Sequence, residues 1–253
     1  MNRTISLINQ KGGSGKTTTV VNLGASLAYL GRKVLLVDLD PQAHTTIHLG
    51  FKPSQVDITI YDVIMNLKNL KTAIINTGIN RLDILPSNIE LSVAEIELVN
   101  MAGREAVLKN SLPGIKDDYD FILIDCPPSL GLLTLNALNA SGEVFIPIQT
   151  EFFALEGMSK LLKTIDIVRE RLNKELKITG IILTMFDSRK NICRDVAEKV
   201  EEFFPGLVFK TRIRDNVKLA EAPSYGKPVI TYAVNSYGSK DYLSLAKEVI
   251  ACG

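Results

Sequence analysis

The sequence predicts an α/β protein with a doubly wound, mostly parallel β-sheet. Strand-like apolar runs alternate with helical patterns along the chain, and several runs are apolar throughout. Such runs are typical of parallel strands that are covered on both faces. No repeat, low-complexity tract or linker divides the chain, so we expect residues 1–253 to form a single domain. A chain of 253 residues that is 46% apolar can bury a sizeable core.

The expected elements follow one another in regular alternation. The strand-like runs cover residues 4–9, 33–40, 81–87, 120–128, 143–149, 177–187 and 207–213. The helical patterns cover residues 16–30, which end at Gly31, and then 90–110, 131–140, 154–173, 190–204 and 239–251. Ligands of such sheets bind beyond the carboxyl ends of the strands. The positions of interest are therefore the strand exits Asn9, Asp40, Asp125, Gln149 and Asp187.

The first strand exit reads "LINQKGGSGKTTT", from Leu7 to Thr19. Glycines at 12, 13 and 15 allow backbone amides to approach a phosphate, and the following helix adds its positive N-terminal dipole. Lys16 is expected to meet the β- and γ-phosphates, Thr17 to ligate Mg²⁺ directly, and Thr18 to contact the α-phosphate. The usual phosphate loop has a glycine where this chain has Gln10, and it does not require the lysine at position 11.

Two further strand exits end in carboxylates. Asp125 closes "FILIDCPP", a buried strand followed by an acid, and is expected to hold Mg²⁺ through water. Asp38 and Asp40 close "VLLVDLDPQ" on the same side of the strand, with Asp40 nearer the phosphates. We expect Asp40 to orient water or magnesium, again through water. The alternative is a solvated turn residue, because Pro41 follows directly.

Cysteine usage and hydropathy indicate the compartment. Cys126, Cys193 and Cys252 are far apart and form no CxxC pair, so they are expected to be reduced thiols of a cytosolic protein. The chain starts directly with a strand rather than a signal peptide, and no apolar run reaches the roughly 20 residues that span a bilayer. We therefore expect a soluble, intracellular protein.

The net charge of +1 conceals an asymmetry along the chain. Residues 1–159 hold 12 Lys and Arg against 16 Asp and Glu, whereas residues 160–253 hold 17 against 12. A surplus of five positive charges in the second segment favours a surface that faces a polyanion. Ordinary scatter of surface charge is the alternative.

Taken together, these motifs resemble a known family. "KGGSGKTT" is similar to the deviant Walker A box of the ParA/MinD group of P-loop ATPases. Five further stretches are similar to the ParA/Soj branch in particular: "VLLVDLDPQA", "DFILIDCPPSLGLLTLNAL", "IPIQTEFFALEGMSKLL", "GIILTMFDSR" and "NVKLAEAPSYGKPVI".

This resemblance implies a Mg²⁺-dependent ATPase that forms a homodimer around two ATP molecules. In this family the ATP-bound dimer binds DNA without sequence preference. A ParB/Spo0J-like partner stimulates ATP hydrolysis through a basic N-terminal peptide, and hydrolysis releases the protein from DNA. The implied role is chromosome or plasmid partitioning. The implied location is the cytoplasm, with nucleoid association in the ATP state and no stable membrane association.

The resemblance also assigns residues. It implies nucleotide binding by Lys11, Gly12, Gly13, Ser14, Gly15, Lys16, Thr17, Thr18 and Asn216, the last reading the adenine edge. It implies catalytic roles for Lys11, Lys16, Asp40 and Asp125. Lys11 matches the signature lysine that reaches ATP in the other subunit, and we expect it to have no use within one subunit. Arg214 stands where relatives often have proline.

The implied DNA contacts are basic residues of the second segment. Arg189 and Lys218 fall at the family's DNA-contact positions, and the same patch can be extended by Lys190, Arg194, Arg212 and Lys227. His44 and His48 are four residues apart, a spacing at which two histidines can bind metal, but no third ligand stands out in the sequence.

Several other functions compete with this prediction. A ParA relative that positions another cargo, such as a plasmid or an organelle, stays open, because the cargo is set by the partner. A MinD-like membrane ATPase needs a basic amphipathic C-terminal helix, whereas this chain ends "YLSLAKEVIACG". An iron–sulfur reductase needs paired cluster cysteines, and a bacterial tyrosine kinase needs a terminal tyrosine cluster. The sequence favours none of these last three.

Overall fold

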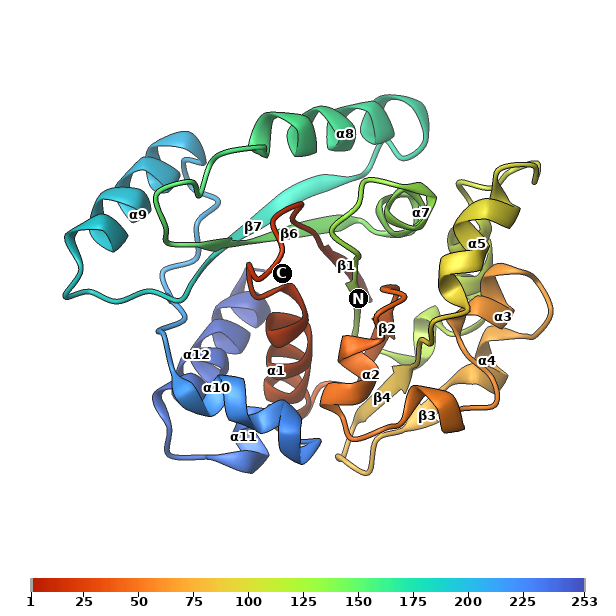
Figure 1. Ribbon diagram of the computed structural model, residues 1–253, viewed down its shortest axis with the longest axis horizontal. Helices are drawn as coiled ribbons and strands as arrows, with labels where there is room; N and C mark the ends of the chain where they lie inside the picture. Colours follow the sequence, from red (N-terminus) through yellow and green to blue (C-terminus); the bar gives the residue numbers. More distant parts are fainter. Residues whose placement is uncertain (1, 253) are drawn as a thin grey trace.

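A seven-stranded β-sheet runs through the centre of the molecule (Figure 1). The computed structural model describes residues 2–252. The strand order is β3-β4-β2-β5-β1-β6-β7, and every neighbouring pair is parallel except β3 and β4. The strands are β1 (Arg3–Leu7), β2 (Val34–Asp38), β3 (Ile75–Asn76), β4 (Leu82–Leu85), β5 (Phe121–Asp125), β6 (Glu143–Gln149) and β7 (Lys177–Thr184).

Helices cover both faces of the sheet, which is why the central strands are apolar at nearly every position. One face packs on α1 (Lys16–Tyr29), α11 (Val229–Tyr232) and α12 (Tyr237–Ala251). The other face packs on α3 (Ile60–Ile64), α4 (Leu70–Ala73), α5 (Leu91–Leu98), α6 (Val107–Ser111), α7 (Leu132–Ala140), α8 (Met158–Arg171) and α9 (Asn191–Phe203). The expectation of an α/β doubly wound, mostly parallel sheet is confirmed.

Short helices fill the connections at the carboxyl edge and on the surface. They are α2 (His44–His48), α10 (Val217–Glu221) and the 3₁₀ helices η1 (Pro53–Gln55), η2 (Leu112–Gly114), η3 (Lys116–Asp118) and η4 (Ala222–Tyr225). The backbone of Gly50, after α2, lies directly against that of Gly226, after η4: a Cβ placed on Gly226 would come within 2.6 Å of the Gly50 Cα. This close approach joins two segments that are far apart in sequence.

Two expected elements are wrong. Residues 207–213 form no continuous strand: they meet the outer edge of β7 at one isolated bridge, Ile181 with Val208, and through a few backbone hydrogen bonds, such as that from the Ile213 N–H to the Leu183 carbonyl (2.8 Å). The Glu248 carboxylate accepts hydrogen bonds from the backbone N–H groups of Lys210 (2.9 Å) and Thr211 (2.8 Å), which draws this segment toward α12. The single helix expected over 90–110 is two helices, because the chain between α5 and α6 turns through Gly103 at a φ of 71°.

Gly180 in β7 allows two aromatic rings to pack against the sheet. A Cβ at this position would lie 2.4 Å from Phe209 and 2.7 Å from Phe145, whose rings meet edge to face with centroids 5.2 Å apart. Gly180→Ala should therefore lower the free energy of unfolding by about 1–3 kcal/mol, since neither buried ring can move away freely. Urea titration measures this. Gly114→Ala is the control, because a Cβ there meets nothing within 4 Å; equal stabilities would contradict the packing argument.

Candidate functional site

The loop between β1 and α1 exposes backbone amides at the carboxyl edge of the sheet. Gly13 and Gly15 take left-handed conformations, with φ of 73° and 87°, that favour glycine. Asn9 anchors the start of the loop, because its Nδ2 donates to the Pro147 carbonyl (2.7 Å) and its Oδ1 accepts from the Lys11 N–H (2.9 Å). Within residues 2–252, no side chain caps α1 and no acid occupies its first turn. The N-terminus of α1 is thus open to an anion.

Lys16 and Ser14 lie inside this loop. The Lys16 side chain is buried, and burial lowers its pKa, although the nearby Asp125, Cys126 and Asp40 act in the opposite direction. The Ser14 hydroxyl is buried with no hydrogen-bond partner among the described residues. Both side chains therefore gain a partner if a phosphate enters the loop.

Asp125 and Asp38 end neighbouring strands and face each other in register. Both are buried, and burial is the main cause that raises the pKa of Asp125 to about 6 and that of Asp38 to about 8. For Asp38, the charge of Asp125 raises it further. Oδ1 of Asp125 has no hydrogen-bond partner within residues 2–252. A cation at this position would relieve the repulsion between the two carboxylates.

Asp40 lies at the rim of the same site. Its Oδ1 accepts a hydrogen bond from the Gln42 N–H (2.9 Å), and its carbonyl accepts one from the Ser87 hydroxyl (2.9 Å). The turn after β2 is thus held on both sides of Asp40, and Ala43, three residues further on, has a left-handed φ of 53°. Asp38 is the deeper carboxylate and Asp40 the more accessible one.

Helix α2 supplies two threonines that the sequence analysis did not single out. Thr45 Oγ1 donates to Asp125 Oδ2 (2.8 Å), and the Thr46 N–H and Oγ1 both donate to Asp38 Oδ2 (2.8 and 2.7 Å). The Thr-Thr pair after the "DPQA" box is the signal that could have revealed them. These bonds tie α2 to both buried carboxylates.

Lys11 forms an ion pair within its own subunit, contrary to our expectation that it has no use there. Its Nζ lies 3.1 Å from Glu151 Oε2, and Gln149 Nε2 donates to the other oxygen of Glu151 (2.5 Å). Both partners of the ion pair are accessible, with side chains 36% and 56% exposed. Exposed ion pairs of this kind contribute about 0–1 kcal/mol, so Lys11 can leave it at little cost.

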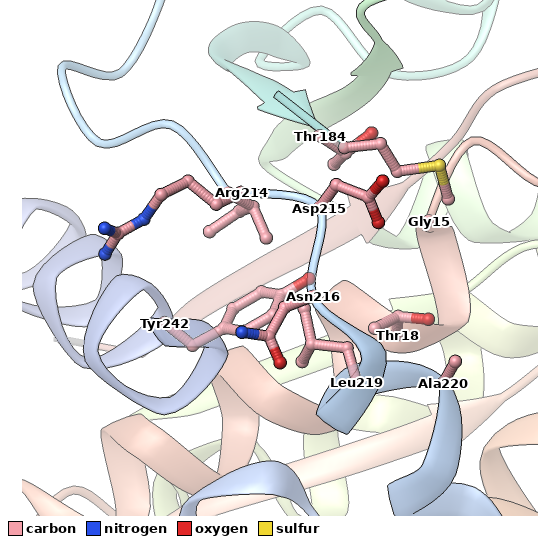
Figure 2. A pocket seen from close by; sticks show the side chains of 11 residues that line it. Gly15, Thr18, Thr184, Arg214, Asp215, Asn216, Leu219, Ala220 and Tyr242 are labelled. Carbon is pink, nitrogen blue, oxygen red and sulfur yellow. The ribbon is translucent and has the colours of Figure 1, made fainter. Parts of the chain in front are cut away.

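A pocket opens beside the phosphate loop, between β7, α10 and α12. It is lined by Gly15, Thr18, Thr184, Met185, Ile213, Arg214, Asp215, Asn216, Leu219, Ala220 and Tyr242 (Figure 2). Asn216 caps α10, because its Oδ1 accepts from the Lys218 N–H (2.9 Å). The guanidinium of Arg214 points away from the pocket toward α12, where its Nε lies 3.0 Å from Asp241 Oδ2. Arg214 thus contributes backbone rather than charge.

The basic residues of the expected DNA surface lie in the loops and helices that follow β7. Lys190 and Lys227 are exposed, and Arg194 contacts the Ser188 carbonyl (2.9 Å). Three others face acids at 2.8 Å: Arg189 faces Asp187, Arg212 faces Glu201 and Lys218 faces Glu221. Figure 1 shows α9, which follows Lys190, above α10 on the same side. The surface is less strongly positive than the sequence indicates, since local acids offset part of it.

The two histidines do not form a metal site. His44 is exposed and His48 is buried, and residues 2–252 contain no group of three His, Cys, Asp or Glu side chains placed to hold a metal ion. Cys126 and Cys193 are buried, whereas Cys252 is exposed. Across the same residues, no helix has the length and apolar character needed to cross a membrane.

The fold and this site define a class. A glycine-rich loop before α1 meets two buried carboxylates at the carboxyl edge of a parallel sheet, which is the arrangement of a P-loop nucleoside triphosphatase. Comparison with known proteins narrows the class. The family model described as "AAA domain" matches residues 2–178.

Relatives match the full length of the chain. It is 51% identical to the sporulation initiation inhibitor protein Soj of Bacillus subtilis (strain 168), covering 100% of both proteins. It is 48% identical to the chromosome partitioning protein ParA of Myxococcus xanthus (strain DK1622), over 98% of this chain and 88% of that protein. A crystal structure of cobyrinic acid a,c-diamide synthase from Mycobacterium smegmatis, with bound ADP and magnesium, is 37% identical with a TM-score of 0.87, covering 99% of this chain and 94% of that one. The chain belongs to the ParA/Soj family of chromosome-partitioning ATPases.

The buried His48 is expected to make the stability of the protein depend on pH. Burial lowers its pKa to about 4 from 6.5, although a bond to the Lys227 backbone opposes this. Between these values the unfolded chain binds a proton that the native chain does not, so stability is lost as the pH falls. At pH 5 this loss is about 2 kcal/mol relative to pH 7.5. His48→Gln should remove that part of the pH dependence in urea titrations.

The matched control is His44→Gln at an exposed position, which should keep the wild-type pH profile. If His48→Gln loses as much stability on acidification as the wild type does, burial of an uncharged His48 does not cause the loss of stability at low pH.

Proposed function

We propose that this chain is a Mg²⁺-dependent ATP hydrolase acting in chromosome or plasmid partitioning. The observation that carries the proposal is the meeting of an uncapped helix N-terminus with Lys16, Asp40 and Asp125 at one edge of the sheet. In this site Lys16 binds the β- and γ-phosphates, and Gly12 to Thr18 surround them with backbone N–H groups. Asp40 positions the attacking water, because at 9% exposed it is more accessible than Asp125 and Asp38.

The residues present fit a nucleotide with magnesium. Two buried atoms, Ser14 Oγ and Asp125 Oδ1, have no partner within residues 2–252, and they belong to the phosphate loop and to the strand end beside it. Thr17 would ligate Mg²⁺ directly, and Asp40 and Asp125 would hold it through water. When bound, the ion neutralises charge on the phosphates. Relatives support this assignment, since the Mycobacterium smegmatis structure contains ADP and magnesium.

The pocket beside the loop suits an adenine base. Its lining includes the apolar side chains of Ile213 and Leu219 and the ring of Tyr242. Asn216 Oδ1 is engaged by the Lys218 N–H, so its Nδ2 is the group that can donate to a ring nitrogen of the base. Arg214 adds no charge to this pocket.

A second copy of the chain would complete the site. In the proposed ATP-bound dimer, Lys11 leaves Glu151 and supplies a cation to the phosphates held by the other subunit, in the manner of an arginine finger. Gly12 is exposed, and a Cβ added to it meets nothing within 4 Å in its own subunit. This leaves room at the phosphate loop for the backbone of a second copy.

Dimerisation would also create the DNA surface. Each subunit offers Arg189 and Lys218, extended by Lys190, Arg194, Arg212 and Lys227, and a dimer doubles the number of cations. Log K for DNA falls with log salt at about 0.9 per phosphate bound, so doubling the number of bound phosphates raises affinity steeply at low salt. DNA phosphates must displace local acids such as Asp187 and Glu221 from the basic side chains. Because each displacement costs binding energy, one patch alone binds DNA weakly and both patches are needed.

The cellular role follows from these activities. A ParB/Spo0J-like protein, through a basic N-terminal peptide, would stimulate hydrolysis and release the dimer from DNA. The protein would then be cytoplasmic, nucleoid-associated with ATP, and without stable membrane association. Positioning of a different cargo by the same cycle is the second candidate, and it differs only in the partner.

Asp40→Ala tests the catalytic assignment. The variant should hydrolyse ATP about 10²-fold more slowly or worse, because water positioning is lost. It should still bind ATP, since the phosphate loop is unchanged. Phosphate release and equilibrium binding of a fluorescent ATP analogue measure the two effects. Asp117→Ala, at an exposed surface aspartate, is the control, and a wild-type rate for Asp40→Ala would show that another residue orients the water.

Charge reversal tests the DNA surface. With ATP present, Arg189→Glu and Lys218→Glu should each weaken binding to duplex DNA by about tenfold or more. The slope of log K against log salt concentration should become smaller by about 1 for each phosphate that the variant no longer binds. Dimerisation should be unchanged by light scattering. Arg32→Glu, exposed just beyond the carboxyl end of α1, is the control.

Gly12→Val adds a second arm to this experiment. Its side chain occupies space that is empty in one subunit, so the variant should fold, bind ATP and stay monomeric. Tight ATP-dependent DNA binding by a Gly12→Val monomer would contradict the proposal that two patches are required.

A further inference from the structure

Helix α5 carries apolar residues on two opposite faces. Leu91, Ala94 and Leu98 are buried in the core beneath it. Ile89, just before the helix, and Val93 and Ile96 within it are 65%, 44% and 73% exposed. Positions four and seven residues apart lie on one side of a helix, so these three form a continuous stripe that faces solvent. Stripes of this kind mark sites of protein interaction.

The exposed stripe has acids along one side. Residues 88–98, which form the turn before α5 and the helix itself, contain three Glu and no Lys or Arg. Glu90 and Glu97 are seven residues apart and therefore border the stripe on the same side. Glu97 accepts a hydrogen bond from the Tyr61 hydroxyl (3.1 Å), which holds its carboxylate beside α3. The apolar stripe thus has a negatively charged border.

A groove continues from this stripe toward the catalytic turn. It is lined by Asn88, Ile89 and Glu90 before α5, by Asp62 of α3, by Pro53, Ser54, Val56 and Asp57, and by Pro41, Gln42 and Ala43. The last three residues directly follow Asp40. Figure 1 shows α5 and α3 together on the side of the molecule opposite α9 and α12. The apolar stripe and the turn that carries Asp40 therefore belong to one surface.

We propose that the surface formed by Ile89, Val93, Ile96, Glu90, Glu97 and the adjoining groove docks a basic, amphipathic peptide of a partner protein. Apolar side chains of the peptide pack on the stripe, and its Lys or Arg residues face Glu90, Glu97, Asp57 and Asp62. This inference rests on the proposed function, because it gives a place to the partner peptide that stimulates hydrolysis.

The charge of the surface argues against other occupants. The four acids Glu90, Glu97, Asp57 and Asp62 outnumber the two nearby bases, which are Lys52 before Pro53 and Arg104, whose guanidinium bonds to Val99 and Glu105. This excess of negative charge disfavours DNA and anionic lipid headgroups. A basic peptide is the occupant whose charge matches.

The position of the groove explains how docking could act on hydrolysis. A side chain seated against Pro41, Gln42 and Ala43 contacts the turn that immediately follows Asp40. The Gln42 N–H holds Asp40 Oδ1 (2.9 Å), and Ala43 is in the left-handed region. Displacing this turn changes the direction of the Asp40 carboxylate. Docking on α5 therefore reaches a residue that orients water without touching the nucleotide.

The experiment uses the full chain with ATP and DNA and a synthetic peptide copying the basic N-terminal segment of the ParB-type protein of the same organism. Peptide binding is followed by fluorescence anisotropy and stimulation by phosphate release. Ile96→Asp, and separately the pair Glu90→Lys with Glu97→Lys, should weaken peptide binding at least tenfold. Both should keep the peptide-free rate of hydrolysis and DNA binding. Val234→Asp, at another exposed apolar position, should bind the peptide normally.

A charge-swapped peptide separates docking from a general structural effect. With its Lys and Arg replaced by Glu, it should bind the Glu90→Lys, Glu97→Lys variant and not the wild type. If both variants bind and respond to the original peptide like the wild type, the docking surface is overturned while the proposed function stands. Loss of the ATP-dependent dimer in Ile96→Asp would instead identify the face as a contact between copies and overturn the proposal. No binding or stimulation of the wild type would overturn both this proposal and the partner assignment.

Discussion

Burial of charge at one edge of the sheet is the constraint on which the remaining site depends. Because β2 and β5 pair in register, Asp38 and Asp125 end side by side out of contact with water. Lys16 is buried beside them at the start of α1. Removing charges from water is costly unless each finds a partner, and two like charges raise each other's pKa. The directions of the pKa shifts of these three residues all reflect that cost.

Helix α2 relieves part of this cost and connects the site to the rest of the protein. Its Thr45 and Thr46 donate hydrogen bonds to the two buried carboxylates. Just after its end, Gly50 packs against Gly226, and the buried His48 lies beside the Lys227 backbone. Helix α2 therefore contacts both the nucleotide site and the segment that precedes Lys227.

The surfaces of the molecule are divided by charge. The basic positions lie in the loops and helices after β7, and the acidic, apolar surface of α5 lies on the opposite side (Figure 1). Opposite signs on opposite sides allow two partners of different charge to bind without competing. The phosphate loop and the Asp40 turn lie between them, where both partners can influence a single bound nucleotide.

The sequence by itself determined the parallel sheet and the composition of the nucleotide site. Apolar runs ending in Asn9, Asp40 and Asp125 predict strand exits because hydrophobic pattern and turn chemistry are local properties, and "GGSGKTT" specifies a phosphate loop for the same reason. Contacts between distant segments were not predictable. Only the tertiary structure decided that Lys11 meets Glu151, that Glu248 draws residues 210–211 out of a strand, and that Glu201 of α9 faces Arg212 in the basic patch. It also decided that α5 exposes an apolar face, since the pattern of a helix does not reveal which of two apolar sides the core will cover.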